Sequence, residues 1–166
     1  NQIELAKNIL KEGEVNFPNE FSFINLLAQI SLKNKEIQSG INLLKKSLII
    51  NPKQPIVMFD LGVALSINNQ LDEAILFFDK SVELDPKNLQ AFMRKAITLN
   101  RLDRFNDSID CYQKIIELNP NFVDAYINQA EIFNSIGKTE VSLHVYKKVL
   151  KIDPNNAKLF IKYGNV

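Results

Sequence analysis

The sequence of 166 residues is 46% apolar, which is enough for a buried core, and its 20 basic and 19 acidic side chains give a formal net charge of +1. This balance gives no electrostatic reason to expect binding to nucleic acid or to an anionic membrane. The single cysteine, Cys111, excludes an intramolecular disulfide framework and a thiolate metal cluster, and the lack of 18 consecutive apolar residues excludes a membrane-spanning helix.

In chain order, the sequence predicts short helices separated by polar turns. Residues 3–10 place apolar side chains at helical spacing, and Gly13 ends that segment. Four units of 34 residues follow, each with two predicted helices joined by a three-residue turn. Such short turns predict antiparallel helical hairpins. The first helices are expected over 21–33, 55–67, 89–101 and 123–135, and the second helices over 37–50, 71–84, 105–118 and 139–152.

Each second helix is followed by an Asn-Pro or Asp-Pro pair. Proline has no amide hydrogen to donate and pushes the residue before it out of the helical region, so each helix is predicted to end there. These prolines recur every 34 residues, together with one before the first full unit: Pro18, Pro52, Pro86, Pro120 and Pro154.

Two columns of small residues recur with the same period. The first column consists of Ala28, Gly62, Ala96, Ala130 and Gly164. The second column consists of Ala6, Gly40, Ala74, Ser108 and Ser142. Small side chains let the two helices of a hairpin approach closely, and larger residues fill the space around them. Three independent columns at one period predict a repeat architecture.

The second unit resembles the tetratricopeptide repeat. It carries that family's order of a large apolar residue, Leu-Gly, a second large residue, alanine, an aromatic residue and proline: Met58, Leu61, Gly62, Leu65, Ala74, Phe78 and Pro86. The resemblance covers essentially the whole chain. It implies an all-α fold, a right-handed α-α superhelical solenoid of helical hairpins. Lys95 and Gln129 depart from the pattern, because leucine occupies their position in the earlier units.

We expect a single repeat array over residues 1–166. Its parts are the second helix of a truncated repeat at 1–20, full repeats at 21–54, 55–88, 89–122 and 123–156, and the start of a further repeat at 157–166. Terminal repeats normally present a polar cap. Phe160 and Tyr163 therefore predict that the chain is part of a longer polypeptide.

The resemblance implies a protein-interaction scaffold, since tetratricopeptide arrays bind a peptide or a partner protein in a concave groove lined by their first helices. The periodicity places ten residues on this face as the predicted groove: Ile56, Phe59, Asp60, Val63, Ile67, Met93, Arg94, Ile97, Ile127 and Glu131. Phe59 and Met93 are expected to stay exposed because they are long. Val63 and Ile97 either join the groove or complete packing between adjacent first helices.

We expect this groove to take an extended or helical peptide by apolar anchors, with Asp60, Arg94 and Glu131 as a polar rim. Chaperone-binding members of the family instead clamp a terminal carboxylate with Lys and Asn side chains. The corresponding positions here offer Arg94 as the one cation, and Asp60 would repel such a ligand.

No set of residues in the sequence supports catalysis. His144 is the only histidine and falls on the outward side of a second helix, and carboxylates such as Asp72 and Asp107 lie at helix starts, where they complement the helix dipole. We therefore expect no enzyme activity, no cofactor and no metal in this chain, and no nucleic-acid or membrane partner.

Two alternatives from other classes stay open at this point. The array is the substrate-recruiting arm of a larger enzyme of glycosyltransferase or sulfotransferase type, or it is a self-association scaffold, a homo-oligomer whose exposed end helices stack between copies. The expected location is the cytoplasm.

Overall fold

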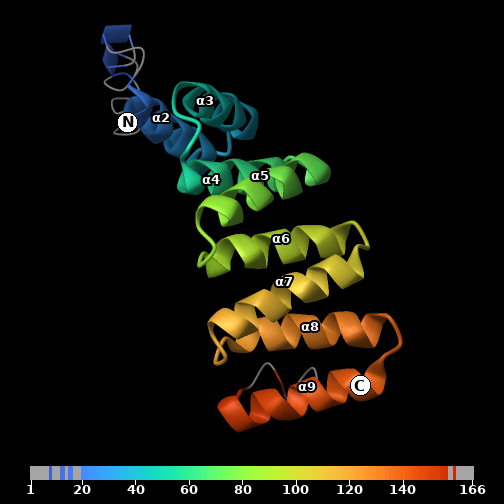
Figure 1. Cartoon of the computed structure of the whole chain (residues 1–166). Helices are drawn as coiled ribbons and strands as arrows, with labels where there is room; N and C mark the ends of the chain where they lie inside the picture. The colour runs from blue at the N-terminus through green and yellow to red at the C-terminus, as the bar shows by residue number, and fades with distance from the viewer. Residues whose placement is uncertain (1–7, 9–11, 14, 17–19, 157–158, 160–166) are drawn as a thin grey trace. The chain divides into compact units, whose positions relative to one another are not determined.

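The computed structural model describes residues 8, 12–13, 15–16, 20–156 and 159. Residues 20–156 form eight helices and no strand (Figure 1). The helices are α2 (Phe21–Lys33), α3 (Ile37–Ile50), α4 (Pro55–Ile67), α5 (Leu71–Leu84), α6 (Leu89–Arg101), α7 (Phe105–Leu118), α8 (Val123–Ser135) and α9 (Thr139–Ile152). All eight begin and end at the residues expected from the sequence, which confirms the all-α repeat fold.

The two ends of the predicted array lie largely outside the described residues. This applies to most of the helix expected over 3–10 and to Phe160, Tyr163 and Gly164. The truncated first repeat, the start of a further repeat and self-association through end helices therefore stay predictions.

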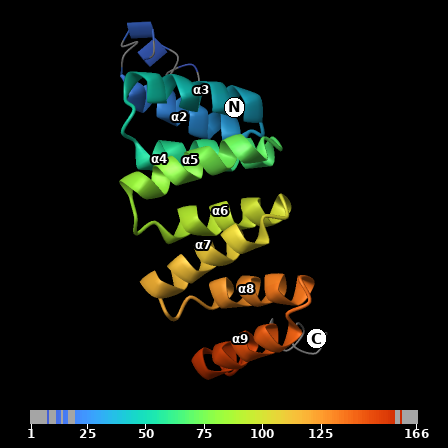
Figure 2. The ribbon, with the colours of Figure 1, turned by 45° about the vertical axis from the view of Figure 1, so that its right-hand side comes forward.

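The chain divides into two compact units, Asn1–Pro86 and Lys87–Val166. In the first unit, α2 pairs with α3 and α4 with α5, and α3 packs on α4. The second unit repeats this order, with α6 paired with α7, α8 paired with α9, and α7 packed on α8. Figures 1 and 2 show the helices of each hairpin side by side. The division falls close to the boundary expected between the second and third full repeats.

Each hairpin turns at one residue with a positive φ angle. These residues are 34 positions apart: Lys35 (63°), Asn69 (62°), Asp103 (56°) and Gly137 (78°). In the first hairpin, the amide of Glu36 donates to the carbonyl of Ser31 at 2.9 Å, and the amide of Lys35 donates to the carbonyl of Leu32 at 3.0 Å. This is the Schellman pattern, which satisfies the last carbonyls of a helix and fixes the reversal of the chain.

The small residues lie where the helices of a hairpin come closest. The hydroxyl of Ser108 on α7 donates to the carbonyl of Ala96 on α6 at 2.8 Å, so members of the two small columns meet. In the first unit, a Cβ added at Gly62 would lie 2.7 Å from the ring of Phe78, which is fully buried. The close approach of α4 and α5 therefore leaves no room for a side chain at Gly62.

The departure from the repeat pattern at Gln129 has a structural explanation. Its side chain is buried in α8, where earlier units carry leucine, and its amide donates to the carbonyl of Ile109 on α7 at 3.4 Å. A buried amide is tolerated when it finds a hydrogen-bond partner. The α7–α8 contact thus includes a polar link at this position.

Replacing Gly62 with leucine is expected to lower the free energy of unfolding by about 1–3 kcal/mol, because the added atoms overpack the contact with Phe78. The change is measured as a lower urea midpoint with an unchanged m-value. Ile67→Leu on the same helix is the control, with an expected change within about 0.5 kcal/mol because Ile67 is 64% exposed. Equal midpoints for Gly62→Leu and the wild type would contradict the proposed contact.

Replacing Gly137 with alanine is expected to cost about 1 kcal/mol through backbone strain alone. The φ angle at Gly137 is 78°, and nothing lies within 4 Å of the added Cβ, so steric contact plays no part. Lys35→Gly is the complementary variant, since it relieves the same strain in the first hairpin and should lose no stability. If thermal melting shows equal losses for both variants, the turn is not under the strain described.

Candidate functional site

A cavity of about 310 Å³ lies on the first unit between α2, the α3–α4 connection and the start of α4. Its walls combine amides and one carboxylate with aliphatic side chains: Asn25, Gln29, Leu44, Gln54, Pro55, Ile56, Val57 and Asp60. Two of the predicted groove residues, Ile56 and Asp60, are therefore part of its lining.

The side chain of Gln54 lines this cavity and is held by hydrogen bonds at both ends of its amide. Its buried side-chain amide nitrogen donates to the carbonyl of Asn51 at 2.8 Å, and to the hydroxyl and carbonyl of Ser47 at 3.0 and 3.2 Å. Because the nitrogen faces three oxygens, the orientation of the amide is fixed, and its own oxygen must point the other way. That oxygen accepts a hydrogen bond from the side chain of Asn25 on α2 at 3.0 Å.

The same chain of hydrogen bonds fixes the orientation of Asn25. Its amide nitrogen faces Gln54, so its Oδ1 atom points away from that bond. Oδ1 is buried and finds no hydrogen-bond partner among the described residues. A buried acceptor left unpaired costs about 1–3 kcal/mol, and the burial of Oδ1 keeps it out of reach of a ligand in the cavity.

Asp60 brings a half-buried carboxylate to the cavity. Burial raises the pKa of the Asp60 carboxyl above its usual range, and a hydrogen bond from Gln29 acts in the opposite direction. Within residues 20–86 no ion pair involves Asp60, whereas Lys45 on α3 pairs with Glu73 at 2.6 Å. The charge of Asp60 is therefore desolvated without compensation by a cation within residues 20–86.

The apolar groove residues predicted on α4 differ in their exposure. Ile56 is 68% exposed at the edge of the cavity, and Ile67 is also exposed at the other end of the helix. Phe59 is half-buried, with its ring centroid 6.1 Å from that of Phe78, and Val63 packs against the same core. Ile56 is thus the apolar side chain best placed to meet a ligand of the first unit.

The second unit has its own cavity of about 320 Å³, on the face shared by α6 and α8. It is lined by Ile97, Asn100, Tyr112, Asn128, Glu131, Ile132 and Ser135, so it includes two more of the predicted groove residues, Ile97 and Glu131. Burial raises the pKa of Tyr112 to about 12, against the effect of a hydrogen bond with Asn128. The phenol is therefore protonated at neutral pH.

The expectation that Met93 is exposed is wrong. Its side chain is only 8% exposed, and its sulfur accepts a hydrogen bond from the amide of Asn128 on α8 at 3.6 Å. Methionine is flexible enough to fold under a neighbouring helix. Ile127 is also interior, at 3%, in a cluster with Ala130 and Tyr146. Of the remaining predicted residues, Arg94 is exposed on α6.

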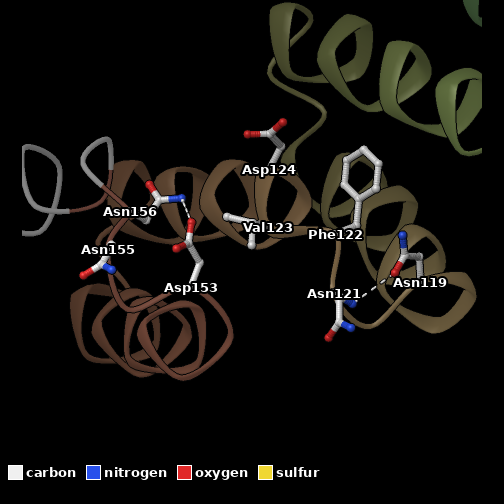
Figure 3. A pocket seen from close by; sticks show the side chains of 8 residues that line it. All are labelled: Asn119, Asn121, Phe122, Val123, Asp124, Asp153, Asn155 and Asn156. Carbon is white, nitrogen blue, oxygen red and sulfur yellow. Dashed lines mark hydrogen bonds between the residues drawn. The ribbon is translucent and has the colours of Figure 1, made fainter.

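A third cavity, of about 440 Å³, lies in the second unit beside the connections that precede α8 and follow α9 (Figure 3). Its polar groups already serve the turns. The side chain of Asn119 accepts from the amide of Asn121 at 3.1 Å, and Asn156 donates to Asp153 at 2.8 Å. We assign no ligand to this cavity, which contains none of the predicted groove residues.

Sequence reasoning missed Gln54. The signal was its place in the repeat, where Asn88 and Asn156 occur one and three periods later. Asn88 accepts from the amide of Ala91 at 3.1 Å, the usual role of a residue that begins a helix. The longer Gln54 makes no such bond and reaches back to the preceding helix instead.

The described residues contain neither a candidate metal centre nor a candidate membrane-spanning helix. No group of three or more His, Cys, Asp or Glu side chains among them is placed to hold a metal ion. None of the helices in this part of the chain has the length and apolar character needed to cross a membrane.

Solved structures with a similar fold include a MamA protein, with a TM-score of 0.88, 19% identity, and coverage of 95% of this chain and 86% of that chain. YrrB, described as a TPR protein with an unusual peptide-binding site, has a TM-score of 0.87 and 16% identity, with 100% and 85% covered. MamA from Desulfovibrio magneticus RS-1 has a TM-score of 0.85 and 15% identity, with 93% and 88% covered. At these identities the likeness shows the fold alone.

Comparison with curated protein sequences gives no match. Family profiles described as tetratricopeptide repeat match residues 43–76, 89–122 and 111–140, which together make up more than half of the chain. The matches cover helices of both units, and they agree with the 34-residue period and the eight-helix architecture. The chain belongs to the tetratricopeptide repeat family.

Proposed function

We propose that the chain is a non-catalytic protein-interaction scaffold that binds a peptide segment of a partner protein on the face formed by its first helices. The family membership supports a binding scaffold. The finer proposal is supported by the position of the cavities, because each unit has one on this face, and four predicted groove residues line them: Ile56, Asp60, Ile97 and Glu131.

The single observation that carries the proposal is the exposure of Ile56 beside the cavity of the first unit. An isoleucine that is 68% exposed leaves most of its apolar surface in water. Covering such a side chain contributes about 1.5–3 kcal/mol to association, and an apolar anchor next to a pocket is typical of peptide-binding surfaces. Ile56 therefore serves as an anchor contact, with the cavity receiving the neighbouring side chain of the ligand.

The cavity of the first unit favours an internal peptide segment over a free carboxyl terminus. None of its lining residues is cationic, and Asp60 would repel a terminal carboxylate. An extended or helical segment held by apolar contacts suits this lining better. YrrB has a peptide-binding site by its own description, which supports the class of ligand.

The proposal predicts that peptides selected from a random display library against the purified chain lose affinity when Ile56 is changed to serine. Truncating an apolar anchor costs about 1–3 kcal/mol of binding free energy. The measurement is calorimetric titration of the selected peptide into wild type and Ile56→Ser. The fold should be unaffected because Ile56 is mostly exposed.

Leu76→Ser is the matched control, since Leu76 is 49% exposed on α5, the second helix of the same hairpin. Its affinity for the peptide should equal that of the wild type. A library that yields no binder would contradict peptide binding itself. Equal loss in both variants, or loss only in Leu76→Ser, would show that the ligand uses another face.

A further inference from the structure

The polar character of the cavity of the first unit includes one charged group, the carboxylate of Asp60. Asp60 has no cationic partner within residues 20–86, and its carboxyl accepts a hydrogen bond from Gln29. Gln54 uses its amide hydrogens on Ser47 and Asn51, and the unpaired Oδ1 of Asn25 is buried out of reach of a ligand. The uncompensated charge of Asp60 therefore favours a ligand that brings a positive charge.

The remaining walls are aliphatic. Leu44, Pro55, Ile56 and Val57 complete the lining of the cavity. A ligand group with a hydrocarbon stem and a polar, donor-rich end matches both parts of this lining. The volume of about 310 Å³ lies near the lower end of the ~300–1,000 Å³ usual for ligand pockets, which suits one side chain of a peptide.

We propose, building on the peptide-binding function, that this cavity selects a basic side chain of the bound peptide, Lys or Arg, whose stem packs on Ile56 and Pro55 and whose cationic end pairs with Asp60. Lysine offers three donors and arginine five, and neither brings an acceptor. Both can therefore pair with the Asp60 carboxylate without adding a further acceptor.

Other side chains fit the cavity less well. A glutamate would place a second negative charge beside Asp60. An apolar side chain would desolvate the Asp60 carboxylate further without pairing it. A serine or glutamine would donate a hydrogen bond to Asp60 but would leave its charge uncompensated. The positive charge is what separates the proposed ligand from these alternatives.

The test uses three pools of short peptides with blocked termini, which differ only at a central position occupied by Lys, Gln or Glu. The other positions are randomised among uncharged residues, and binding to the full chain is measured by fluorescence anisotropy. The Lys pool is expected to bind about tenfold more tightly than the Gln pool, because a partly desolvated charge pair with Asp60 contributes about that factor. The Glu pool is expected to bind most weakly.

Asp60→Asn should lower the affinity for the Lys pool about tenfold and leave the affinity for the Gln pool unchanged, because only the charge pair is lost. Asp72→Asn is the matched control. It removes the same charge from the same unit, but Asp72 is exposed at the start of α5 and does not line the cavity. Its affinities for all three pools should equal those of the wild type.

Asp60→Asn should fold at least as well as the wild type at neutral pH. Because the pKa of Asp60 is raised in the folded state, its ionised form disfavours folding at every pH above that pKa, and the penalty disappears as the pH falls through it. Asparagine removes the penalty at neutral pH. A melting temperature equal to or above that of the wild type confirms that any loss of affinity is not a loss of fold.

The outcomes separate this inference from the function on which it rests. Equal affinities for the Lys, Gln and Glu pools, or an unchanged affinity of Asp60→Asn for the Lys pool, would overturn the selection of a basic side chain and leave peptide binding intact. Preference for the Glu pool would overturn it as well. If no pool binds, the peptide-binding function fails, and the inference fails with it.

Discussion

The close approach of the two helices in each hairpin is the constraint on which the rest of the structure depends. Gly62 can face the ring of Phe78 only because it has no side chain. The hydroxyl of Ser108 can reach the carbonyl of Ala96 because both residues are small enough for α6 and α7 to lie close together. A hairpin packed this tightly buries one face of its first helix and leaves the other available. Ile56 and the two cavities that contain predicted groove residues lie on that other face, so the packing of the repeat leaves them available to the proposed peptide.

The helices could be predicted from the sequence because their signals are local and repeated. Proline ends each second helix, and the 34-residue period aligns weak signals in one unit with strong ones in another. The positions of the turns were predicted from the sequence, but their backbone conformation was not. Glycine, which adopts a positive φ angle without strain, occupies only one of the four turn positions, Gly137. Lys35 adopts the same φ region in the first hairpin, where the Schellman hydrogen bonds hold it.

The sequence predicts which face of the first helices holds the candidate site, but it does not predict the contacts between the side chains there. Ile56 and Asp60 lie on the first-helix face where the periodicity placed them. Met93 is buried, and its sulfur accepts a hydrogen bond from Asn128 on another helix. The periodic pattern of one helix gives no information about such a contact between helices. Gln54 was missed for the same reason, since its role depends on partners on α2, on α3 and in the connection from α3 to α4.

The bonds of Gln54 make it a brace between α2 and the joint that connects α3 to α4. One end of its amide holds Ser47 and Asn51 at the joint, and the other end holds Asn25 across the cavity. The position of α2 along one wall of the cavity is therefore tied, through a single side chain, to the joint between the two hairpins of the first unit. Loss of the Gln54 amide would free both at once, since the same group holds them.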